Sequence, residues 1–106
     1  MRIQTVEECL NSRIALVLIS GEGCANCVSM LPMVLKYENH EEMNVCVMEV
    51  QEEMKNFLER FHVSVVPTIL LLNKGELVAK VSGYQPEEIF DLYLEAKLNE
   101  MNERSL

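Results

Sequence analysis

The sequence predicts an α/β fold in which a central mixed β-sheet of about four to five strands is flanked by helices on both faces. Two short apolar runs rich in Val, Ile and Leu, at residues 14–20 and 45–50, are typical of strands buried on both faces. Helical segments connect the apolar runs, and parallel strands need such crossover connections. A third apolar run at 68–73 leads through a turn at 74–75 into residues 76–81, which predicts an antiparallel hairpin.

Four helices are predicted around these strands, at residues 5–11, 24–39, 52–61 and 86–99. Thr5 and Glu8 have the spacing of a capping box, which marks the start of the first helix. Pro32 lies inside the second helix and should bend or break it. Pro86 suits the first turn of the last helix, and residues 99–106 should form a frayed tail. Together these elements make one domain over residues 1–106.

Length and composition predict one soluble globular domain. The chain has 106 residues, nearly half of them apolar and a quarter charged. The net charge is −8, whereas nucleic acids and anionic membranes attract clustered Lys and Arg, so we expect neither as a partner.

No apolar run approaches the roughly 20 residues of a membrane span. Acidic residues, Glu7 and Glu8, precede the run at 14–20, which argues against a signal peptide and predicts a cytoplasmic protein.

The stretch Cys24-Ala25-Asn26-Cys27 carries the chemistry that the sequence predicts. It follows the apolar run at 14–20 and opens a predicted helix. Two thiols three residues apart can close a small disulfide ring and reopen it. Unpaired N–H groups at a helix start stabilise a thiolate, so the position of Cys24 makes it the reactive thiol. The leading hypothesis is therefore disulfide exchange with other proteins.

The other two cysteines leave a second interpretation open. Cys9 and Cys46 could complete a four-ligand zinc site with Cys24 and Cys27. However, Cys46 lies mid-strand among apolar residues, and Cys9 lies in a short helix without a close partner. Both are better interpreted as small apolar residues, with Cys46 in the core and Cys9 partly exposed. We expect no bound metal and no cofactor.

From residue 14 to about 98 the sequence resembles the thioredoxin family. A buried strand leads into the CxxC stretch, and Pro32 stands five residues beyond Cys27. Val66-Pro67-Thr68 then enters a hairpin with a glycine turn, and Gly83 precedes a terminal amphipathic helix. The resemblance rests on the order and spacing of these features, since a lone CxxC is a weak signal. It implies a thioredoxin fold.

The resemblance also implies a substrate groove around the two cysteines. In this family the proline that matches Pro67 is cis and lies against the active-site sulfurs, and the residue before it offers its backbone to a bound peptide. Val66 and Pro67 would therefore form one wall of the groove. The other walls would be formed by Ser82, Gly83 and Tyr84 on one side and by Gly23, Ala25 and Asn26 on another.

Roles for individual residues follow from the same resemblance. Cys24 would attack a substrate disulfide, and Cys27 would resolve the resulting mixed disulfide. Electrons would come from a thioredoxin reductase or an equivalent donor, and the protein would be a monomer. Glu49 alternates with Val45 and Val47 and by family alignment lies under the active site, where it could accept a proton from Cys27. The alternative is a solvated carboxylate near a strand end.

Several positions depart from the family pattern. Gly23 stands where Trp is usual, Leu18 where a buried Asp is usual, and Val28 where a basic residue is usual, while Asn26 replaces a common proline. Less polar surroundings raise thiol pKa values in general, so we expect slower exchange at neutral pH. A binding module of the same fold with slow or vestigial CxxC chemistry, or a dithiol redox sensor, therefore remains an alternative hypothesis.

Overall fold

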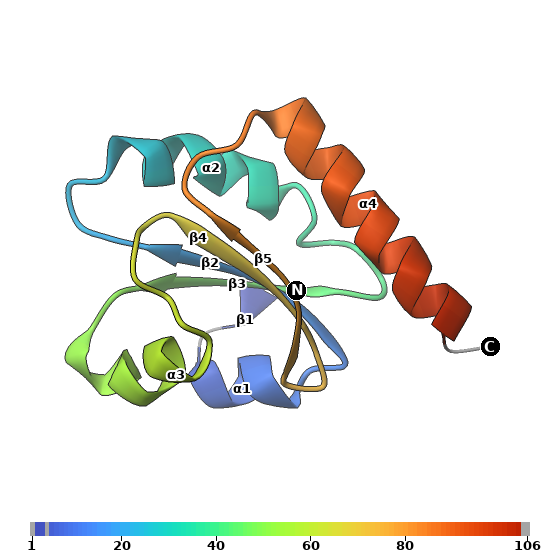
Figure 1. Cartoon of the computed structure of the whole chain (residues 1–106), viewed down its shortest axis with the longest axis horizontal. Coiled ribbons are helices and arrows are strands. Elements are labelled where there is room, and N and C mark those ends of the chain that lie inside the picture. The colour runs from blue at the N-terminus through green and yellow to red at the C-terminus, as the bar shows by residue number, and fades with distance from the viewer. Residues whose placement is uncertain (1, 4, 105–106) are drawn as a thin grey trace.

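A mixed sheet with helices on both faces organises the computed structural model, which describes residues 2–3 and 5–104 (Figure 1). The sheet has five strands in the order β1 (Arg2–Ile3), β3 (Asn44–Glu49), β2 (Ile14–Ser20), β4 (Thr68–Asn73) and β5 (Glu76–Ser82). Strands β1, β3 and β2 run parallel, whereas β4 pairs antiparallel with both β2 and β5. The predicted fold class is confirmed. Strand β1 was not predicted, because its two residues carry no periodic pattern.

The central strand β2 positions the CxxC stretch. Its residues 14–19 are all buried, which explains the continuous apolar run. Alternate side chains enter opposite halves of the core: Leu16 and Leu18 pack in one, Val17 and Ile19 in the other. At its end, β2 is flanked by the close of β3 and the start of β4, because Ile19 pairs with both Met48 and Thr68. The chain therefore leaves the sheet between these two neighbours and reaches Cys24 within a short loop.

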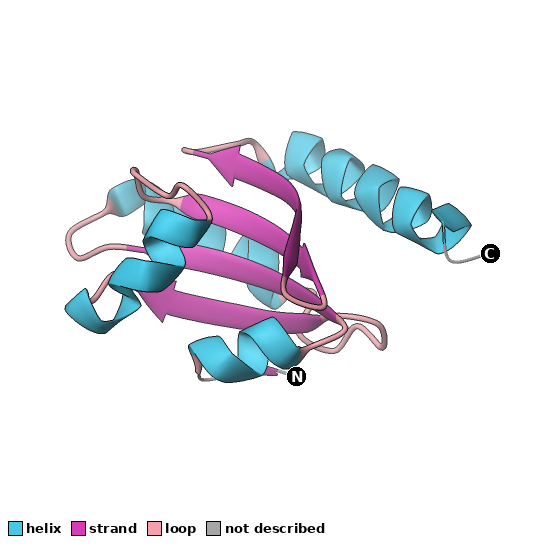
Figure 2. Ribbon diagram, turned by 60° about the horizontal axis from the view of Figure 1, so that its bottom comes forward, coloured by secondary structure: helices cyan, strands magenta, loops and turns pink. Residues whose placement is uncertain are grey.

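Two helical layers cover the sheet, one on each face (Figures 1 and 2). Helices α2 (Ala25–Leu35) and α4 (Glu87–Arg104) cover one face, and α1 (Val6–Asn11) and α3 (Lys55–Arg60) cover the other, with a 3-10 turn over Glu52–Met54 before α3. Thr5 caps α1 as predicted, since its Oγ1 accepts a hydrogen bond from the Glu8 N–H at 3.1 Å. Among the described residues, no helix is both long enough and apolar enough to cross a membrane.

The prediction for the second helix is partly wrong. Helix α2 runs through Pro32 without a break and ends at Leu35, and residues 36–39 form turns instead of more helix. Proline removes one backbone donor, but the helix keeps its buried face of Met30, Met33 and Val34 against the sheet. Tertiary packing therefore outweighs the single missing hydrogen bond.

The predicted frayed tail is also wrong over residues 99–104, because α4 continues to Arg104. Met101 is only 7% exposed and extends the buried stripe of Phe90, Leu94 and Leu98, so the last turns are held by core contacts. Residues 105–106 of that tail lie outside the described part of the chain.

Polar contacts fasten α4 to the end of α2. The Tyr37 hydroxyl donates a hydrogen bond to Asp91 Oδ1 at 2.8 Å, and Lys36 Nζ pairs with Asp91 and, at 3.2 Å, with Glu87. Burial, followed by the hydrogen bond to Asp91, raises the pKa of Tyr37 to about 12. The hydrogen bond to Asp91 likewise raises the pKa of Lys36. Asp91, the one Asp in the sequence, thus serves helix packing far from the cysteines in the chain.

Candidate active site

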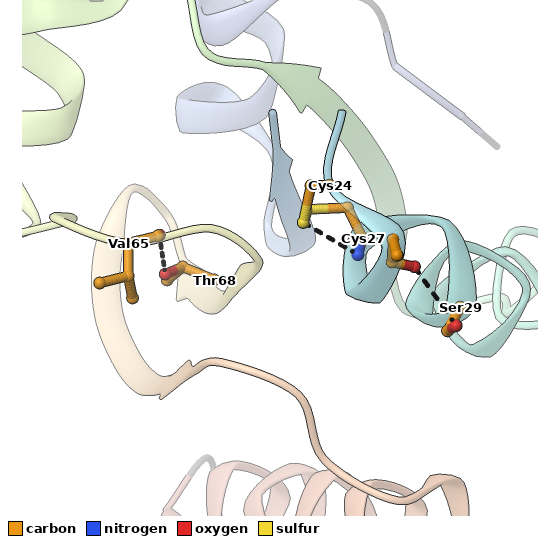
Figure 3. The surroundings of a disulfide bond; sticks show 6 residues. Cys24, Cys27, Ser29, Val65 and Thr68 are labelled. Carbon is orange, nitrogen blue, oxygen red and sulfur yellow. Dashed lines mark hydrogen bonds between the residues drawn. A yellow bond between two sulfur atoms is a disulfide. The ribbon is translucent and has the colours of Figure 1, made fainter. Parts of the chain in front are cut away.

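Cys24 and Cys27 form a disulfide at the N-terminus of α2 (Figure 3). Their Cα atoms are 5.2 Å apart, which is within the usual range for a disulfide. Cys24 is the N-cap residue, and its Sγ accepts a hydrogen bond from the Cys27 N–H at 3.2 Å. The first turn of α2 holds no acidic residue, so no carboxylate of that turn offsets the positive end of the helix. This environment favours negative charge on the Cys24 sulfur once the disulfide is reduced.

Exposure differs between the two cysteines. Cys24 is partly exposed, whereas Cys27, the third residue of α2, is 2% exposed. Cys24 is therefore the more accessible of the two cysteines. The arrangement can support attack by the outer sulfur and internal displacement by the inner one.

The segment from Val65 to Thr68 forms a wall beside this disulfide. The Val66–Pro67 peptide bond is cis, the geometry that the resemblance implies. Pro67 is buried, while Val66 is 36% exposed and remains accessible. The side chain of Val66 lies against Gly21, and a Cβ atom built on Gly21 would approach Val66 Cγ2 to 2.9 Å. Gly21 therefore joins the loop before Cys24 to the wall that carries Val66.

Gly83 forms the next part of the wall. Its N–H donates a hydrogen bond to the Pro67 carbonyl at 2.7 Å, and its φ of 82° lies in the region that favours glycine. The following residue, Tyr84, is 47% exposed. Gly23, Ala25 and Asn26 are also exposed around the disulfide. The structure thus joins the predicted Val66–Pro67 and Gly83 segments directly, and places Gly23, Ala25 and Asn26 next to the cysteines in the chain.

Glu49 does not meet the premise of the proton-acceptor hypothesis. It follows the same face of β3 as Val45 and Val47, as predicted, but it is the last residue of the strand and is exposed. It pairs in register with Ser20, at the point where β2 also ends. The expected burial is therefore wrong, and Glu49 matches the solvated alternative, because the sheet ends before it can cover this side chain.

Three of the departures from the family pattern, at Leu18, Val28 and Gly23, differ in their surroundings. Leu18 is fully buried and packs with the core between the sheet and α2. Val28, in contrast, is 72% exposed, and Gly23 is exposed as well. Of the three, only Leu18 changes the interior, whereas Val28 and Gly23 change the surface next to the cysteines in the chain, and their effect on the thiols stays a prediction.

Cys9 and Cys46 form a separate buried pair. Both are fully buried on the opposite face of the sheet, so the expected partial exposure of Cys9 is wrong. A hydrogen bond with Cys9, together with burial, raises the pKa of the Cys46 thiol. The expectation that Cys9 has no close partner is therefore also wrong. Among the described residues, no group of three or more His, Cys, Asp or Glu side chains is placed to hold a metal ion.

Two features of the wall were missed from the sequence. No role was predicted for Gly21, and Thr68 was interpreted only as part of the Val-Pro-Thr pattern. The Thr68 hydroxyl is buried and donates a hydrogen bond to the Val65 carbonyl at 2.7 Å (Figure 3). A threonine at the first position of a strand whose next four residues are apolar was the available signal for this second contact.

Comparisons with known proteins agree with this geometry. Residues 8–98 match the family model of the thioredoxin-like domain. The structure is similar to that of a point mutant of a thioredoxin from Halobacterium salinarum, with a TM-score of 0.75 and 22% identity over 92% of this chain and 88% of that one. It is also similar to the short form of thioredoxin f from spinach chloroplast, with a TM-score of 0.72 and 18% identity over 92% and 91% of the two chains.

No curated protein sequence matches this chain. At such low identities the two structural similarities show the fold, while the family model covers most of the sequence. The chain belongs to the thioredoxin-like family.

Proposed function

We propose that the protein is a thiol–disulfide oxidoreductase that reduces disulfides of other proteins through Cys24 and Cys27. The observation that carries this proposal is the asymmetry of the pair: Cys24 caps α2, is partly exposed and accepts the Cys27 N–H, whereas Cys27 is 2% exposed. Membership of the thioredoxin-like family supports the same reaction type in general terms.

The reaction proceeds in two exchange steps. In the first, the Cys24 thiolate attacks a substrate disulfide; a Cys24–substrate bond forms as the substrate disulfide breaks, and one substrate sulfur leaves as a thiolate. In the second, the Cys27 thiolate attacks Cys24 Sγ, which forms the bond present in this structure and releases the second substrate thiolate. Two electrons pass to the substrate, and its two thiolates take up protons from water. A thioredoxin reductase or an equivalent dithiol donor restores the two thiols.

The surface around Cys24 favours a protein segment as the substrate. Three apolar side chains on separate segments, Val28, Val66 and Tyr84, are exposed. None of the hydrogen bonds among the described residues uses the backbone N–H or C=O of Val66. These groups are therefore open to an extended peptide on either side of a disulfide. We propose that the protein acts as a monomer in the cytoplasm, where thiols are kept reduced.

Reduction of insulin disulfides in the presence of dithiothreitol tests the proposal. We expect the wild-type protein to accelerate the reaction and Cys24→Ser to abolish the acceleration. Cys27→Ser should accumulate a mixed disulfide at Cys24, visible as a covalent adduct by mass spectrometry. Cys46→Ala is the matched control, because that thiol is buried on the other face of the sheet. The proposal is wrong if Cys24→Ser is as active as wild type.

The second candidate function is a binding module of the same fold. The observation that favours it is Leu18, which is buried beneath the site and leaves no carboxylate at that position to handle protons. A module or redox sensor would retain its partner in the Cys24→Ser variant, whereas an oxidoreductase would lose its activity.

A further inference from the structure

Thr68 is a polar residue in an apolar part of the fold. It is the first residue of β4, pairs in register with Ile19 of β2 and Ser82 of β5, and is fully buried. Among the described residues it is the one polar side chain in the buried core. Burying a hydroxyl without a hydrogen bond costs free energy, because its contact with water is lost. The Thr68 hydroxyl avoids this cost by donating to the Val65 carbonyl at 2.7 Å (Figure 3).

The hydrogen bond from Thr68 to the Val65 carbonyl also fixes the orientation of the Val66 N–H. A peptide group is planar, so the C=O of Val65 and the N–H of Val66 rotate as one unit. The only cis bond among the described residues is Val66–Pro67, so the preceding bond is trans and its N–H points opposite to its C=O. With the carbonyl held toward the buried hydroxyl, the Val66 N–H is directed away from Thr68.

The rest of the segment is held by two further contacts. The Gly83 N–H donates to the Pro67 carbonyl at 2.7 Å, and the Val66 side chain is packed against Gly21. The residues on each side of Val66 are thus restrained, while its own backbone groups take part in no hydrogen bond within the described part of the chain. The Thr68 bond is the one contact of the three that acts on the peptide group containing the Val66 N–H.

We propose that Thr68 is a positioning residue for protein substrates: its hydroxyl orients the peptide group between Val65 and Val66 so that the Val66 N–H can pair with the chain that flanks a substrate disulfide. This inference rests on the proposed function, since it concerns the same site. It assigns Thr68 no contact with substrate or with the reacting sulfurs. Its effect should therefore be seen with substrates that carry a peptide backbone.

Two variants and two substrates test this inference. Thr68→Val has nearly the same shape but no hydroxyl, and Thr68→Ser keeps the hydroxyl. Insulin presents peptide backbone beside its disulfides, whereas 5,5′-dithiobis(2-nitrobenzoate) has none. The quantity compared is the ratio of kcat/KM for insulin to the rate constant for the small disulfide. We expect Thr68→Val to lower this ratio by about five- to tenfold, the factor that corresponds to one hydrogen bond. The loss should arise mainly from a higher KM for insulin. Thr68→Ser should keep this ratio within about twofold of wild type.

Several results would overturn the inference. An unchanged ratio in Thr68→Val would do so, as would a loss in Thr68→Ser equal to that in Thr68→Val. An equal loss with both substrates would show a merely structural role. If the wild-type protein reduces neither substrate, the proposed function itself fails, which is a different outcome from failure of the role of Thr68.

A second measurement covers the case in which Thr68→Val does not fold. The Cys27→Ser protein can be joined to a short cysteine-containing peptide through Cys24, with the Thr68 hydroxyl intact. We expect amide hydrogen exchange at Val66 to slow by about tenfold or more in this adduct relative to a Cys24 adduct with 2-mercaptoethanol, because one backbone hydrogen bond has formed. Equal exchange in the two adducts would contradict the inference.

Discussion

The Val66 side chain rests directly on the backbone of Gly21, at a distance that leaves no room for a Cβ atom at residue 21. A Cβ built there would lie 2.9 Å from Val66 Cγ2, and 3.7 Å from Val66 Cβ. This contact joins the loop that precedes Cys24 to the wall that carries Pro67. The loop that leads to Cys24 and the segment that carries Val66 and Pro67 are therefore in direct contact through two residues.

Gly21→Ala tests this contact. The backbone of Gly21 does not lie in the left-handed region, so the substitution adds a methyl group without backbone strain. Val is stiff at χ1, so we expect overpacking to lower the free energy of unfolding by about 1 to 3 kcal/mol and to reduce insulin reduction as the wall shifts. Urea unfolding and the insulin assay measure the two effects.

Val66→Ala supplies the matched control for this prediction. In the double variant Gly21→Ala/Val66→Ala, the added methyl group meets no Cγ2 atom, so the loss of stability should be smaller than the sum of the two single losses by about 1 kcal/mol. Strict additivity of the two substitutions would show that the contact does not couple the two segments.

Burial predicts which thiols can be alkylated. In the reduced native protein, iodoacetamide should modify Cys24 alone, because Cys27 is 2% exposed and Cys9 and Cys46 are fully buried. After denaturation, all four cysteines should react. Intact-mass spectrometry and peptide mapping count and place the adducts. Rapid native modification of Cys46 would contradict the burial described for the α1–α3 side of the sheet.

Tyr37 should make stability depend on pH at high pH. Its folded-state pKa is raised to about 12, above the ordinary value of about 10, so the folded state favours the neutral hydroxyl that donates to Asp91. This contribution is fully present below about pH 10 and is lost as the pH rises through about 12.

Tyr37→Phe measures that contribution. At pH 8 we expect it to lower the free energy of unfolding by about 1 to 2 kcal/mol, since Asp91 loses one hydrogen-bond donor. The difference from wild type should shrink between about pH 10 and pH 12, because Tyr37 ionises in the unfolded chain from about pH 10 while the folded protein holds it neutral until about pH 12. Urea unfolding at several pH values gives both curves. If the difference in the free energy of unfolding between Tyr37→Phe and wild type stays constant across this pH range, Tyr37 is not the source of the pH dependence.

The end of α4 provides a test of core packing. Met101 is 7% exposed, so Met101→Ala should lower the free energy of unfolding by about 2 to 5 kcal/mol. Leu92→Ala lies on the same helix but at a side chain that is 69% exposed, and it should change stability by less than about 0.5 kcal/mol. If thermal or urea unfolding shows equal effects for both, the last turns of α4 are not packed as described.

The strands were the most predictable part of the fold. Residues 14–20 form β2 with the predicted bounds, because a strand buried on both faces leaves a continuous apolar run that ends where burial ends. The end of α4 was less predictable, since Met101 is separated from Leu98 by polar residues and its burial depends on where α4 crosses the sheet. Likewise, the alternation of residues in β3 correctly predicted the face of the sheet on which Glu49 lies. The strand ends at Glu49, however, and its carboxylate is exposed.

The site was predictable where a residue type is required by local geometry. A cysteine at a helix start can be recognised from the sequence, as Cys24 was. The hydrogen bond from Thr68 to Val65 and the packing of Val66 on Gly21 arise only when the loops before α2 and β4 meet, so no local pattern contains them. The exposure of Val28 was not predicted for the same reason, because the sequence does not show that its helix face points to solvent.

The midpoint potential of the Cys24–Cys27 couple tests the central claim most directly. Alkylation of the thiols in a graded dithiol buffer, followed by mass spectrometry, gives the fraction reduced at each potential. A reductase of protein disulfides should show a reversible two-electron couple confined to these two residues, near or below the cytosolic glutathione poise of roughly −220 to −320 mV. A much higher potential would indicate an oxidant or isomerase. If no disulfide forms between Cys24 and Cys27 in any buffer, the exchange mechanism is contradicted and the binding module becomes the better account.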